Sequence, residues 1–157
     1  MLRITPLAKA EVSKSSRVLL MLLLVAAPRA AAAQRPAPLE GFVANVARLW
    51  GAGNASGIVA LAPGDGRIEL DLGDGRAGAV EARHVAAALR ELFGDRTHVS
   101  VRAAQVTIAG GEPLRGFGEL TWVSRPRGVT DAETSTVYVG AVWEPDGWKV
   151  REIRLLR

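Results

Sequence analysis

The sequence predicts an α+β domain, a curved antiparallel sheet with three N-terminal helices packed on it. Between residues 39 and 93, apolar residues mostly recur every three or four positions, which is typical of amphipathic helices. After residue 97 the chain is rich in Val, Thr and Ile, which favour strands. Because helices and strands are segregated along the chain, helices are expected to cover one side of a sheet.

The first 33 residues have the layout of a secretory signal peptide. An apolar run at residues 18–27 is followed by Ala31–Ala33, which fits the small-residue cleavage rule. Four basic residues precede the run: Arg3, Lys9, Lys14 and Arg17. Since a helix needs about 20 apolar residues to cross a bilayer, a membrane anchor is the weaker alternative. We expect cleavage at Ala33 or nearby, and a domain exported to the periplasm or the medium with no stable membrane anchor.

The net charge of +4 belongs to this leader. Five of the 20 Lys and Arg residues and one of the 16 Asp and Glu residues lie in it, which leaves fifteen of each sign in residues 34–157. A neutral domain lacks the electrostatic surface that nucleic-acid binding needs, so we expect no nucleic-acid partner. The absence of cysteine excludes thiol catalysis and Cys-based metal sites. We expect no cofactor and no metal, because the glycine pattern at Gly51 and Gly53 follows a predicted helix and not a strand, and the two histidines lack ligand spacing.

The chain from residue 34 to residue 63 predicts a tether and two helices. Residues 34–38 contain two prolines and are expected to be an extended tether before a single domain at residues 39–157. An apolar stripe predicts a helix over residues 39–50 that ends at Gly51–Gly53. Asn54 is well placed to cap a second, shorter helix that stops at Pro63.

The remaining elements follow from a change in period. Alternation from Arg67 to Leu72 predicts a half-buried strand, and a glycine-rich turn leads to a third helix over residues 80–93. Four further strands are expected at residues 98–109, 115–124, 134–143 and 148–155. Their connections are short enough for hairpins, which predicts an antiparallel meander.

Two stretches carry a family likeness. Residues 50–63, WGAGNASGIVALAP, join two helices through a small-residue break, and residues 146–150, DGWKV, open the last strand. Together with the order of elements over residues 39–157, they resemble the nuclear transport factor 2-like superfamily. This group of cone-shaped domains includes ketosteroid isomerases, SnoaL-type polyketide cyclases and scytalone dehydratase. The resemblance implies a cone fold and a homodimer through the open sheet face, but no single function, because this fold hosts many activities.

The resemblance to ketosteroid isomerases can be tested residue by residue. It implies a carboxylate base at the position of Leu70 and a tyrosine at the position of Val46, and neither residue present can serve. Asp71 lies one step beyond Leu70, so its side chain points to the opposite sheet face. These departures argue against isomerase chemistry. The acid–base candidates left for a cofactor-independent lyase or isomerase are His84, Asp71 and Tyr138.

Aromatic residues suggest a binding site. On a cone fold they are candidates for an apolar ligand pocket, and the alternative is that they fill the core. The candidate pocket residues are Trp50, Phe117, Glu119, Trp122, Tyr138 and Trp143. His84 is either a general base or an exposed residue on a helix flank, and His98 is expected to be solvated.

These observations lead to one functional hypothesis and one alternative. The favoured hypothesis is an exported, non-catalytic cone-fold domain that binds a small apolar ligand or a protein partner. The alternative is a cofactor-independent lyase or isomerase that acts on a small hydrophobic substrate by proton transfer. The alternative requires Asp71 or Glu119 to reach another acid–base candidate inside a cavity.

Overall fold

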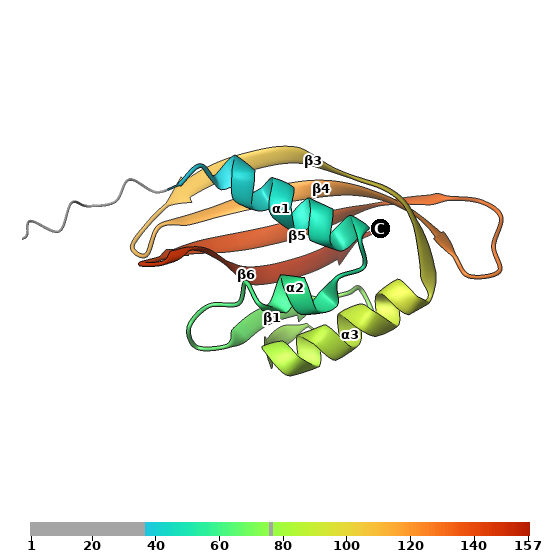
Figure 1. Cartoon of the computed structure of the whole chain (residues 1–157), viewed down its shortest axis with the longest axis horizontal. Coiled ribbons are helices and arrows are strands. Elements are labelled where there is room, and N and C mark those ends of the chain that lie inside the picture. The colour runs from blue at the N-terminus through green and yellow to red at the C-terminus, as the bar shows by residue number, and fades with distance from the viewer. Residues whose placement is uncertain (1–36, 76) are drawn as a thin grey trace, which may run out of the picture. The chain divides into compact units, whose positions relative to one another are not determined.

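The computed structural model describes residues 37–75 and 77–157, so the predicted signal peptide, its predicted cleavage site and most of the predicted tether lie outside the described residues. Two of the three helices precede the first strand (Figure 1). In chain order the elements are α1 (Leu39–Gly51), α2 (Ala55–Val59), β1 (Arg67–Asp71), β2 (Gly78–Glu81), α3 (Ala82–Gly94), β3 (Arg96–Gly110), β4 (Arg115–Pro126), β5 (Glu133–Glu144) and β6 (Gly147–Leu156).

The strands form one six-stranded sheet in the order β2-β1-β6-β5-β4-β3. The predicted antiparallel meander is confirmed, since each of β3, β4 and β5 pairs antiparallel with the next strand along the chain. The sheet is nevertheless mixed, because β1 pairs with β6 in parallel. No hairpin fixes the direction of β1 against β6, because the meander lies between them in sequence, so local patterns did not reveal this pairing.

Helix α1 begins and ends close to its predicted positions, α2 ends at Val59, before its predicted stop at Pro63, and α3 begins later than predicted. The cap of α2 is confirmed: the Asn54 side chain accepts a hydrogen bond of 2.8 Å from the Gly57 amide. The predicted start of the third helix at Val80 is wrong, because residues 78–81 form β2, which pairs antiparallel with β1. A four-residue edge strand that begins Gly-Ala carries too little alternation to be recognised. None of the described helices is long and apolar enough to span a membrane.

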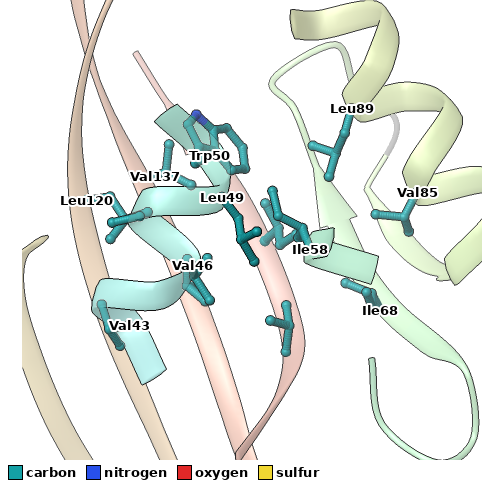
Figure 2. Packing of buried hydrophobic residues seen from close by; sticks show 14 of the residues in the cluster. Val43, Val46, Leu49, Trp50, Ile58, Ile68, Val85, Leu89, Leu120 and Val137 are labelled. Carbon is teal, nitrogen blue, oxygen red and sulfur yellow. The ribbon is translucent and has the colours of Figure 1, made fainter. Parts of the chain in front are cut away.

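All three helices contribute to one core on one face of the sheet. Side chains of α1 and α2, among them Leu49 and Ile58, lie beside one another, with Leu89 of α3 on the other side of Ile58 (Figure 2). Helix α1 packs against β3 and β4, and α3 packs against β1 and β2. Ile58 and Leu89 are fully buried, so the short α2 links the other two helices through the core.

Alternation along β4 identifies the two faces of the sheet. Residues 116, 118, 120, 122 and 124 are buried, and the residues between them are partly exposed. The buried set faces the helices, because a Cβ on Gly118 would lie 2.6 Å from the Val43 side chain of α1. The opposite face, which we call the open face, carries Phe117, Glu119 and Thr121 and is covered by no helix within the described ranges.

Candidate functional site

The helix-covered side of the sheet is filled by aromatic and aliphatic side chains. Trp50 of α1 and Trp122 of β4 are both 0% exposed. The ring of Trp50 packs edge to face against those of Phe93 and Trp122, with centroids 5.1 Å and 5.5 Å apart. The structure therefore places Trp50 and Trp122 in the core, on the opposite side of the sheet from Phe117. The six candidate pocket residues do not share one surface.

His98 is not solvated, and that expectation was wrong. Its ring lies 5.1 Å from the ring of Phe93 and 5.4 Å from that of Trp122, and neither ring nitrogen has a hydrogen-bond partner in the described part of the chain. Burial lowers the pKa of the imidazole from its ordinary value. The charged residues just before it suggested an exposed strand start, whereas Phe93 at the end of α3 closes over it.

On the open face, strand register aligns the other candidates in two rows that run across the sheet. One row joins β3, β4, β5, β6 and β1 through Gln105, Glu119, Tyr138, Arg154 and Asp71. The next row consists of Thr107, Phe117, Gly140, Glu152 and Glu69. Tyr138 therefore lies between a carboxylate and a guanidinium, at the centre of the face.

Tyr138 is held by stacking and by charge. Its ring stacks on Phe117 with centroids 5.4 Å apart and planes 26° from parallel, and the Arg154 guanidinium lies 6.0 Å from its centroid. Arg154 also forms an ion pair with Glu152. Burial, followed by the Glu152 charge, raises the pKa of the phenol, and Arg154 offsets part of this effect. The phenol therefore stays protonated at neutral pH and can both donate and accept hydrogen bonds.

A groove of about 450 Å³ lies over this aromatic pair. Phe117, Tyr138 and Val142 form its apolar floor, and Gly140 lies between them, with the Glu152 side chain against it. Charged groups at its margin include Arg115, Arg151 and Glu152. A smaller hollow of about 270 Å³ adjoins it and shares Glu69 and Glu152 with it.

The three acid–base candidates lie in different surroundings. His84 is exposed on α3, and no hydrogen bond, ion pair or ring contact within the described ranges joins it to Asp71 or Tyr138. Asp71 points to the open face, since Leu70 beside it packs in the core, and its carboxylate accepts a hydrogen bond of 2.9 Å from the Gly73 amide. Asp71 and Tyr138 are in one row, with Arg154 between them.

The remaining predicted residues are placed as follows. Glu119 lies beside Tyr138 on the open face, outside the lining of the groove. Trp143 lies near the end of β5, half-buried, with its ring 5.4 Å from that of Trp148. Val46, at the position of the isomerase tyrosine, is fully buried in the core. Neither Asp71 nor Glu119 projects into the helix-covered side of the sheet.

Sequence reasoning missed Arg115, Gly140, Val142 and Glu152 as groove residues. Arg115 could have been found, because alternation on β4 puts it on the same face as Phe117. Gly140 and Val142 could have been found in the same way, because alternation on β5 puts them on the face of Tyr138, whereas an irregularity in the pairing of β5 with β6 next to Gly140 obscures the position of Glu152. Among the described residues, no group of three or more His, Asp or Glu side chains could hold a metal ion.

The fold defined by these elements is an unclosed, curved sheet with helices on one face. No model of a known protein family and no curated protein sequence matches the chain. Solved structures do resemble it. A DUF4783 family protein from Bacteroides ovatus ATCC 8483 is 14% identical, with a TM-score of 0.57 over 71% of this chain and 91% of its own.

Two further solved structures carry the name of the fold. A domain of unknown function with a cystatin-like fold from Nostoc punctiforme PCC 73102 is 13% identical, with a TM-score of 0.58 over 76% of this chain and 74% of its own. An NTF2-like protein with a cystatin-like fold from Novosphingobium aromaticivorans is 17% identical, with a TM-score of 0.52 over 74% of this chain and 77% of its own. The chain therefore has the nuclear transport factor 2-like fold, as predicted, and identities this low establish the fold alone.

Proposed function

We propose that this chain is an exported, non-catalytic binding domain that holds a small, largely apolar ligand in the groove on its open face. The observation that supports the proposal most directly is the stacked pair of Phe117 and Tyr138 beneath a groove of about 450 Å³. Export rests on the layout of the first 33 residues.

The dimensions and lining of the groove suit a small ligand. Binding pockets for small molecules commonly have volumes of about 300–1,000 Å³ and apolar linings with a few polar groups. Two stacked rings and Val142 supply the apolar surface here, and the Tyr138 hydroxyl supplies a polar group at its edge. A ligand on the other face would have to displace Trp50 and Trp122 from the core.

A binding role agrees better with the placement of the acid–base candidates than a catalytic role does. Proton transfer is most efficient when the pKa of the catalytic group is near the working pH. The pKa of the Tyr138 phenol is raised further from neutrality, and His84 is exposed on a helix without contact to either partner candidate.

The proposal is tested with 1-N-phenylnaphthylamine, a neutral probe that fluoresces in apolar surroundings. We expect the purified protein to bind it, and Phe117→Ala to raise its Kd roughly tenfold, because a lost stacking surface of this size is worth about 1.4 kcal/mol. Val129→Ala is the matched control, since Val129 is exposed on the hairpin loop outside the groove. Absence of binding, or equal Kd values for the two variants and the parent, overturns the proposal.

The homodimer implied by the fold resemblance would occupy the same face. Sedimentation equilibrium with and without the probe distinguishes the two occupants. A monomer that binds the probe supports the proposal. A dimer that dissociates on Phe117→Ala and binds no probe overturns it in favour of a second copy as the occupant.

A further inference from the structure

We infer that the ligand of this groove carries an anionic group, which Arg115 binds at the margin beside Phe117. The ligand class is then a small amphiphile with a flat or ring-shaped apolar body and one carboxylate, sulfonate or phosphate. This inference rests on the proposed function and adds the charge of the ligand to it.

The first step is the position of Arg115. It lies at the start of β4, two residues before Phe117, so alternation directs both side chains to the open face. Its strand partner is Val142, which forms part of the apolar floor. The guanidinium and the aromatic floor are therefore adjacent parts of one groove.

The second step is the charge of the groove. Arg151 is paired with Asp65 at 2.8 Å, Arg154 is paired with Glu152, and Lys149, across β5 from Arg115, is paired with Asp146 at 2.6 Å. Arg115 has no hydrogen bond or ion pair within residues 37–75 and 77–157, and its side chain is exposed. One positive charge is thus left uncompensated at this margin.

The third step is to compare an anionic ligand with a cationic one, which would bind a carboxylate of the groove. Glu69 also lines the groove without a partner among the described residues, but β5 and β6 separate its strand from that of Phe117. Three strand spacings correspond to roughly 14 Å. The nearer carboxylate, that of Glu152, which extends over Gly140, is already paired with Arg154. When the ring of a ligand lies on the aromatic floor, the nearest charged side chain without an ion-pair partner is therefore that of Arg115.

Arginine also suits the task chemically. Its planar guanidinium presents five N–H donors and binds carboxylate, sulfonate or phosphate oxygens in pairs, with a charge that no physiological pH removes. At the edge of an apolar groove the surrounding dielectric is lower than in water, so the attraction is stronger than at a fully solvated site.

The experiment compares two probes with the same ring system: 8-anilinonaphthalene-1-sulfonate, which carries one negative charge, and the neutral 1-N-phenylnaphthylamine. We expect the anionic probe to bind about tenfold more tightly, with an affinity that falls as sodium chloride is raised. Arg115→Gln should raise the Kd of the anionic probe about tenfold and leave that of the neutral probe within about twofold. Arg115→Lys should restore part of the difference, because it keeps the charge and loses the paired donors.

Arg125→Gln is the matched control, an exposed arginine on the same strand that lies outside the groove. An equal effect of Arg125→Gln and Arg115→Gln, or equal affinity for both probes, overturns the inference and leaves the proposed function standing. Binding of neither probe overturns the proposed function itself. Thermal unfolding should be unchanged in both variants, because neither side chain is buried.

Discussion

At the scale of single residues, the burial of His98 between two aromatic rings couples stability to pH. The folded protein lowers the pKa of this imidazole below its ordinary value of 6.5, because burial disfavours the charged form. Above the unfolded pKa the ring is neutral in both states and stability is at its full value. As the pH falls below that value, the unfolded chain binds a proton that the folded chain does not, and stability decreases.

We therefore expect the free energy of unfolding to decrease between about pH 7 and pH 5, a window above the ordinary range of Asp and Glu. The measurement is urea denaturation across this window for the parent, His98→Phe and His84→Gln. The slope should disappear in His98→Phe, which cannot titrate, and persist in His84→Gln, because His84 is exposed. A slope that survives in His98→Phe contradicts this account.

Residue-level patterns show what the sequence could and could not reveal about the site. Phe117 and Trp122 are five positions apart on one strand, so alternation alone assigns them to opposite faces. The pairing of Phe117 with Tyr138 depends instead on the register between two strands, which no local pattern fixes. The aromatic composition thus pointed to an apolar site, and strand geometry decided which aromatics belong to it.

At the scale of elements, the contact between α1 and β4 depends on the absence of side chains. A Cβ on Gly118 would lie 2.6 Å from Val43, closer than real Cβ contacts allow. Both groups are in the core, and the helix lies directly on the strand backbone at this point. Such contacts are invisible in a search for apolar periodicity, because glycine contributes nothing to the pattern.

Gly118→Ala should therefore destabilise the protein by about 1–3 kcal/mol, since one added methyl group overpacks the interface. Gly41→Ala is a matched substitution on the exposed side of α1, where a Cβ meets nothing within 4 Å. It should stabilise the protein by roughly 0.5–1 kcal/mol through helix propensity. Urea denaturation measures both, and the same sign for the two substitutions would rule out close packing as the cause.

Most elements were predictable because each carries its own periodic signal. The long strands β3 to β6 and the helix α1 bury regular stripes, and their predicted limits agree with the structure to within one or two residues. β2 has four residues and an edge position, so its pairing with β1 comes from tertiary packing. The parallel junction of β1 with β6 has the same origin, since it joins segments some eighty residues apart.

At the scale of the whole domain, the helices and the sheet share one core. Ile58 of α2 is fully buried between residues of α1 and α3 (Figure 2), and the same cluster includes Leu120 and Val137 of the sheet. α2 itself is five residues long and would not be stable alone. Its stability must come from this packing, so it should not unfold separately from the sheet.

Ile58→Ala consequently tests whether the helices and the sheet unfold together as one cooperative unit. Removal of a fully buried isoleucine side chain costs about 2–5 kcal/mol, a large part of the 5–15 kcal/mol typical of a domain. We expect tryptophan fluorescence, which reports on all four tryptophans, among them the buried Trp50 and Trp122, and far-ultraviolet circular dichroism, which reports on helices and strands, to show a single coincident transition. This transition should be shifted to lower urea in the variant. Val99→Ala, at an exposed position on β3, should leave the midpoint nearly unchanged. If the helical signal of Ile58→Ala is lost before the fluorescence change, the helices form a separate unit, and the single core described above is not what stabilises the domain.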